Sequence, residues 1–244
     1  MANWSDPRSD IAGFGGATAA RGAAFDAGLR SYMLSVYNYM ASGVLLTGVV
    51  ALLFASSGMA ASVFTGPGIL KYIVMFAPLL FVMVLSFGIK RLSTVAAQGL
   101  FWAYAAVMGV SLSYIFLAYT GTSIAQTFFA TAAAFAGLSL WGYTTKKDLS
   151  GFGTFLIMGV VGLLVASLIN IFMQSNAMSL VISGVGVLLF AGLTAYDTQK
   201  IKSIYAQVAG TDMMGKSVVM GALNLYLDFI NMFMFLLRLF GDRR

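Results

Sequence analysis

The sequence predicts an all-α membrane protein with seven transmembrane helices. Of its 244 residues, 60% are hydrophobic and only 9% are charged, and the mean hydropathy is +0.90. Seven apolar stretches are long enough to cross about 30 Å of hydrocarbon, which takes about 20 helical residues. These stretches must be helices, because lipid cannot hydrogen-bond an open backbone and the alternating pattern of barrel strands is absent.

The seven predicted spans follow one another with short connections. In chain order they are expected at residues 32–56, 72–89, 97–119, 123–143, 153–173, 178–198 and 218–240. The short gaps predict one compact transmembrane domain over residues 31–244. Glycines inside the spans indicate close helix packing through small residues, and they are Gly43, Gly48, Gly159, Gly162, Gly184 and Gly186.

Two segments lie outside this pattern. Residues 1–30 are polar and rich in Gly, Ala, Ser and Asp, so we expect a mobile cytoplasmic tail. The first apolar span begins too late and is too long for a cleaved secretory signal. The remaining long connection is 199–217, and its first residues are expected to extend the sixth helix beyond the membrane surface.

The net charge of +6 is explained by topology rather than by nucleic acid. With a cytoplasmic N-terminus, four basic residues lie on the exterior side: Lys71, Arg238, Arg243 and Arg244. The cytoplasmic side then holds ten: Arg8, Arg21, Arg30, Lys90, Arg91, Lys146, Lys147, Lys200, Lys202 and Lys216. This bias predicts a cytoplasmic N-terminus and, with seven spans, an exterior C-terminus. The basic C-terminal tail favours the alternative in which the last segment does not cross.

Ionisable chemistry is scarce in this chain. It has no Cys and no His, and all eight acidic residues are Asp. The chain therefore lacks the usual residues for thiol catalysis and most of those that bind zinc. Only Asp197 and Asp228 lie inside apolar segments. A charged group in a membrane span costs about 3 kcal/mol or more and marks a functional site by default.

The last segment carries a polar stripe around Asp228. Asn224 and Asn231 lie one turn before and after it, on the same helix face. Such a stripe cannot face lipid, and the other faces are apolar, so this helix suits the centre of the bundle. Thr194 lies one turn before Asp197 in the sixth segment.

The sequence leaves open whether the two acids meet. If the last helix enters the membrane at residue 218, Asp228 is about 15 Å deep; if it enters near Leu223, the depth is about 8 Å and the carboxyls can approach. Two carboxylates in one poorly solvated site would titrate as a unit. When both are ionised they offer hard oxygen ligands suited to Ca²⁺. In the structural alternative, each Asp caps a helix or bonds a Tyr or Asn.

Two motifs resemble those of a known family. Residues 195–201 (AYDTQKI) resemble the sixth-helix signature of the Bax inhibitor-1 family, also called the transmembrane Bax inhibitor motif family. Residues 225–231 (LYLDFIN) resemble the seventh-helix signature of its bacterial members. The resemblance covers about residues 25–240. It implies a central C-terminal helix wrapped by the other six and a di-aspartyl pH sensor, Asp197 and Asp228, that gates a calcium leak.

The resemblance also implies a basic latch at the cytoplasmic end of the second helix, held by the acid pair. Arg91 is the best match and Lys90 the second. Ordinary anchoring of basic residues at the cytoplasmic surface is the alternative for both.

The leading functional hypothesis is a pH-sensitive calcium leak channel in the bacterial inner membrane, acting as a monomer in the lipid bilayer without a bound cofactor. The acid pair would hold Ca²⁺ only transiently.

The second hypothesis is a non-transporting regulator of a membrane protease or a stress-response partner, contacted through residues 1–30. An intramembrane aspartyl protease would explain Tyr196-Asp197, but its Gly-x-Gly-Asp motif is missing before Asp228. We therefore expect no enzymatic activity.

Overall fold

The computed structural model describes residues 8–89 and 91–244, with side chains from residue 22 onward. Seven helices in this part are long and apolar enough to cross a membrane, which confirms the predicted all-α fold. The short helices α2 and α5 lie in the connections that follow the first and third spans. In chain order the helices are α1 (Arg8–Ser56), α2 (Met59–Thr65), α3 (Leu70–Gly88), α4 (Thr94–Leu112), α5 (Ile115–Ala118), α6 (Gly121–Thr144), α7 (Ser150–Met173), α8 (Asn176–Val208) and α9 (Met213–Phe240).

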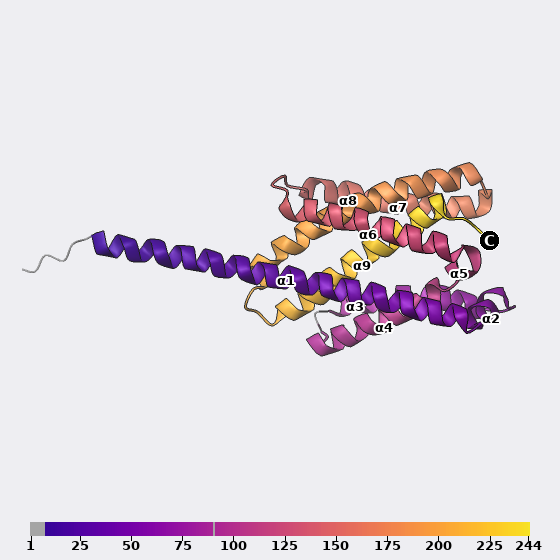
Figure 1. Cartoon of the computed structure of the whole chain (residues 1–244), viewed down its shortest axis with the longest axis horizontal. Coiled ribbons are helices and arrows are strands. Elements are labelled where there is room, and N and C mark those ends of the chain that lie inside the picture. The colour runs from indigo at the N-terminus through magenta and orange to yellow at the C-terminus, as the bar shows by residue number, and fades with distance from the viewer. Residues whose placement is uncertain (1–7, 90) are drawn as a thin grey trace, which may run out of the picture.

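Helix α1 reaches further towards the N-terminus than the predicted first span, and it projects beyond the bundle (Figure 1). Residues before the predicted start of the first span, at residue 32, belong to the same helix. Leu29 is buried, and the ring of Phe25 lies 5.0 Å from that of Tyr205 on α8. Residues 25 and 29, which lie in the predicted tail, therefore contact the bundle. The mobility of residues 1–30 stays a prediction.

The connection predicted at 199–217 is mostly helical. Helix α8 continues to Val208 and α9 begins at Met213, so four residues join them. Gly210 in this turn has φ +74°, a left-handed conformation that favours glycine. The expected extension of the sixth span is confirmed. Helices α8 and α9 pack against each other as an antiparallel pair.

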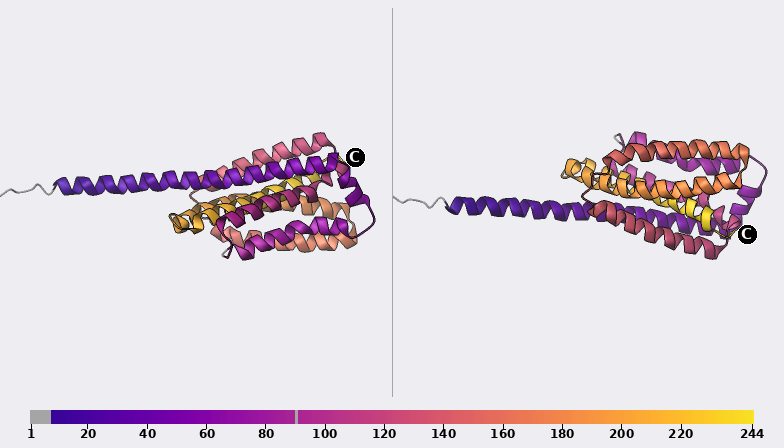
Figure 2. Two further views of the ribbon diagram at one scale, coloured as in Figure 1. Left: turned by 90° about the horizontal axis from the view of Figure 1, so that it is seen from below. Right: turned by 90° about the horizontal axis from the view of Figure 1, so that it is seen from above.

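Helix α9 lies at the centre of the bundle, as predicted. In its most apolar stretch 67% of residues are buried, against 11% in α3 and in α7. Its main neighbours are α1, α4, α6 and α8, while α3 packs on α4 and α7 packs on α8 (Figure 2). Four helices therefore enclose α9 directly. The outer two can remain exposed because they are apolar on nearly every face, which lipid tolerates.

The C-terminal tail shows that the last helix crosses the whole bundle. The backbone N–H of Thr120 donates to the carbonyl of Asp242 (3.0 Å), and that of Arg244 donates to Ala118 (3.1 Å). The tail is thereby tied to the α5–α6 connection, at the end opposite the α8–α9 turn (Figure 1). The alternative in which the last segment fails to cross is wrong.

The glycine prediction is confirmed at three positions and wrong at three. A Cβ placed on Gly43, Gly159 or Gly186 would lie 2.5–2.7 Å from a neighbouring side chain. A Cβ on Gly48, Gly162 or Gly184 would meet nothing within 4 Å in the described part of the chain. Sequence cannot separate these classes, because the residue is the same whether its face meets a helix or lipid.

Candidate functional site

Asp228 is sealed inside the bundle. It lies near the middle of α9, only 4% of its surface is exposed, and its Oδ2 atom is buried without a hydrogen-bond partner among the described residues. Buried polar atoms are nearly always hydrogen-bonded, so an exception calls for an explanation. An orphan carboxylate oxygen does not fit the alternative in which this acid serves only as a cap or a hydrogen-bond acceptor.

The packing of α8 against α9 places the two acids at similar depth. A Cβ on Gly221 would lie 3.3 Å from Ile201, so these two residues are level. The contact of Gly186 with Phe235, at 2.7 Å, gives nearly the same antiparallel register further along. Counting four residues from the first contact sets Asp197 level with residue 225. It is therefore about 4.5 Å from the level of residue 228 along the helix axis.

The two carboxyl groups are electrostatic neighbours in very different surroundings. The charge of Asp197 acts on Asp228, and the ammonium of Lys200 acts on Asp197. Asp197 is partly exposed and Lys200 is exposed, with its Nζ 5.8 Å from the centre of the Tyr196 ring. One acid is thus enclosed by the core, and the other is partly exposed with a lysine one turn away.

The predicted polar stripe is present, but two of its groups are already hydrogen-bonded. The Thr194 hydroxyl donates to the Phe190 carbonyl (2.8 Å), and the Asn231 amide donates to the Leu227 carbonyl (2.8 Å). Both bonds stay within one helix. Asn224 is partly buried one turn before the sealed acid. Support of the pair by these groups stays a prediction.

Arg91 lies at the end of the bundle that holds the α8–α9 turn. Its side chain is exposed, and its backbone N–H donates to the Gly88 carbonyl (2.8 Å) in the turn after α3. A Cβ on Gly215 would lie 2.7 Å from Thr94, which brings the starts of α9 and α4 together. The latch role of Arg91 stays a prediction, and Lys90 lies outside the described residues.

A hydrogen-bond chain beside Asp197 was not predicted. The Tyr37 hydroxyl of α1 bonds the Ser139 hydroxyl of α6 (2.6 Å), which bonds the Thr198 hydroxyl of α8 (2.9 Å). Thr198 donates in turn to the Thr194 carbonyl (2.7 Å). Its only sequence signal was the place of Thr198 next to the acid, because isolated hydroxyls are common in membrane helices.

A polar pocket of about 320 Å³ lies on the exposed side of α8, among Lys146, Lys147 and Lys200. Gln199 links the rim of the pocket to α8 by two hydrogen bonds of 2.8 Å. The Gln199 side-chain oxygen accepts from the Leu149 backbone N–H, and the Gln199 amide donates to the Lys147 carbonyl. At the same rim, hydrogen bonds from Ser150 hold the pKa of Asp148 below its usual range. Tyr196, the residue before Asp197, also lines this pocket, but Asp197 itself does not.

Comparison with known proteins identifies the family. The sequence profile of the family described as "Inhibitor of apoptosis-promoting Bax1" matches residues 29–244. The chain belongs to this family, the Bax inhibitor-1 family. The resemblance seen in the two helix signatures is thereby confirmed.

Similar bacterial proteins cover nearly the whole chain. A protein of Rickettsia prowazekii is 48% identical over 228 residues, which are 93% of this chain and 96% of that protein. Inner membrane protein YbhL of Escherichia coli K12 is 46% identical over 220 residues, 89% and 94% of the two chains. A protein of Caulobacter vibrioides is 46% identical over 231 residues, 90% and 91% of the two. With its seven apolar helices, this member of the Bax inhibitor-1 family is an integral membrane protein.

Proposed function

We propose that this chain is a pH-sensitive calcium leak of the bacterial inner membrane, with Asp197 and Asp228 as its proton sensor and its N-terminus in the cytoplasm. The observation that carries the proposal is the buried oxygen of Asp228, which has no hydrogen-bond partner among the residues that the structure describes and lies within electrostatic reach of the other acid. A carboxylate in such a site is costly unless a proton or a cation neutralises it. Protons and cations therefore compete for the pair.

The pair suits a passing Ca²⁺ better than a resident one. Among the described residues, no group of three or more His, Cys, Asp or Glu side chains is placed to hold a metal ion. Ca²⁺ takes six to eight oxygen ligands, so an ion at two carboxylates keeps much of its water. Weak, partly hydrated binding allows an ion to enter a pore and to leave it.

Gating follows from the charge of the pair. When both acids are ionised, they attract the basic residue Arg91 and hold the α3–α4 turn against the α8–α9 end. Protonation at low pH removes that attraction and favours opening. Protons reach Asp197 first, because it is partly exposed while Asp228 is sealed.

Calcium flux into proteoliposomes, followed with an entrapped indicator dye across a pH series, tests this mechanism. Asp197→Asn and Asp228→Asn should each flatten the pH dependence, because neither amide can be ionised. Asp148→Asn is the matched control: it removes an exposed carboxyl at the same end of the bundle and should leave the profile unchanged. Wild-type pH profiles in both sensor variants would rule the mechanism out.

The projection of α1 beyond the bundle favours one second candidate (Figure 2). A non-transporting regulator of a membrane protease or a stress-response partner could present this helix to its partner. Deleting residues 1–21 and repeating the flux assay separates the two functions. A leak keeps its flux, whereas a regulator shows no flux at any pH in either form and loses its partner on deletion.

A further inference from the structure

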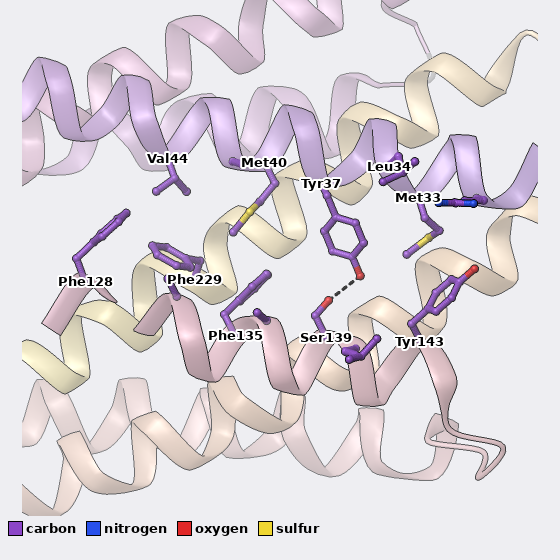
Figure 3. A pocket seen from close by; sticks show the side chains of 15 residues that line it. Met33, Leu34, Tyr37, Met40, Val44, Phe128, Phe135, Ser139, Tyr143 and Phe229 are labelled. Carbon is purple, nitrogen blue, oxygen red and sulfur yellow. Dashed lines mark hydrogen bonds between the residues drawn. The ribbon is translucent and has the colours of Figure 1, made fainter. Parts of the chain in front are cut away.

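A long apolar groove runs between α1 and α6, with α9 behind it. Its volume is about 610 Å³, within the range of about 300–1,000 Å³ typical of ligand pockets. Figure 3 shows Met40 and Val44 of α1 and Phe135 of α6 pointing into the same space, with Phe229 of α9 behind them. The groove is therefore a preformed site rather than a gap between ribbons.

The groove opens sideways towards the lipid. Leu34 and Leu140 line it and are 52% and 64% exposed, and both lie on helices that span the membrane. The hydroxyls of Tyr37 and Ser139 in its wall bond each other at 2.6 Å (Figure 3), so they need no ligand. An apolar cavity does not hold ordered water, and the medium that can fill this one is hydrocarbon.

The length of the groove matches one leaflet of a bilayer. Its lining on α1 begins at Arg30 and ends at Val44, a rise of about 21 Å over fourteen residues. One leaflet, including its headgroup region, is about 20–22 Å thick. The groove therefore reaches from headgroup level to about the middle of the membrane.

One end of the groove is basic. Arg30 lines it and is exposed. Tyr143 also lines the groove, and it contacts Lys202 of α8. The Lys202 Nζ donates to the Tyr143 carbonyl (2.9 Å) and lies 4.9 Å from the centre of the Tyr143 ring. No acidic residue is among those that line the groove in the described part of the chain. Arg30 therefore gives this end of the groove a positive charge of the kind that binds phosphate groups, and Lys202 supplies a second cation next to the lining residue Tyr143.

We propose that this groove binds one anionic phospholipid of the surrounding membrane. An acyl chain lies between α1 and α6, and the phosphate lies at Arg30 and Lys202. The apolar walls, the lateral opening, the length of one leaflet and the basic end all favour this occupant. The proposal does not depend on calcium transport.

Two alanines of α6 allow a matched test. Ala136 and Ala134 are both exposed, but only Ala136 lines the groove. The detergent-purified protein is incubated with phosphatidylglycerol, and the lipid retained is counted by native mass spectrometry. We expect wild type and Ala134→Trp to retain one lipid, and Ala136→Trp to lose at least about 90% of it. Equal retention by the two tryptophan variants would overturn the proposal.

The headgroup assignment is tested by competition between phosphatidylglycerol and phosphatidylcholine. Arg30→Gln should lower the preference for the anionic lipid several-fold, while Lys146→Gln, an equal charge change at an exposed position outside the groove, should not. Equal losses in the two variants, or none in Arg30→Gln, would overturn the headgroup assignment. Monodisperse elution in size-exclusion chromatography confirms that each variant is folded.

Discussion

The α8–α9 interface and the α1–α6 groove lie against the same central helix but are built in opposite ways. At the first, glycines at 186 and 221 let the helices approach until side chains meet a backbone, and one oxygen of an enclosed acid has no hydrogen-bond partner in the described part of the chain. At the second, large apolar side chains line an open space of about 610 Å³. Dense packing is required where a carboxyl must be isolated from lipid and water. Loose packing is tolerated where lipid can fill the space.

The largest effect is expected from breaking the dense packing of α8 on another face, where it meets α6. A Cβ on Gly142 of α6 would clash with the backbone of Ala195 on α8. Gly142→Leu should lower the free energy of unfolding by about 3 kcal/mol, since overpacking costs about 1–3 kcal/mol and backbone yields poorly. Gly137→Leu, on the same helix at a site where a Cβ would meet no described atom within 4 Å, should be nearly neutral. Denaturant unfolding in detergent measures both, and similar losses would contradict the comparison.

A smaller effect of opposite sign is expected from the enclosed acid. Asp228→Leu should raise the free energy of unfolding by about 2 kcal/mol, because it removes a buried unsatisfied polar group, whose desolvation costs about 1–3 kcal/mol. Asp212→Leu, an exposed position in the α8–α9 turn, should change it by less than about 0.5 kcal/mol. The same unfolding assay applies. A less stable Asp228→Leu protein would show that the acid has a structural role.

The smallest effect on stability is expected at Tyr37, which links the α1–α6 groove to helix α8. Tyr37 lines the groove and begins the hydrogen-bond chain that ends on α8. Tyr37→Phe should cost about 1 kcal/mol of stability, the net value of one hydrogen bond, because Ser139 keeps its bond to Thr198. Tyr72→Phe removes an exposed hydroxyl and serves as the control. Matching melting temperatures for the two variants would mean that the chain does not couple the regions.

The sequence predicted the seven spans and the central place of the last one because hydropathy and helix periodicity are local properties. It also singled out Asp197 and Asp228, since a charge inside an apolar run is visible without knowing its neighbours. It did not predict the α1 contacts at Phe25, nor which glycines pack closely. Those depend on which helix faces which.

By itself, then, the sequence determined that this chain crosses the membrane seven times and keeps two acids in its last two spans. Only the tertiary structure decided that those acids lie at nearly the same depth, because the register of α8 on α9 is set by contacts such as Gly221 with Ile201. It also decided that one oxygen of Asp228 finds no partner within residues 22–89 and 91–244 and that α1 and α6 leave a groove between them. Register and lateral neighbours arise from contacts between residues far apart in the chain, and no local pattern encodes them.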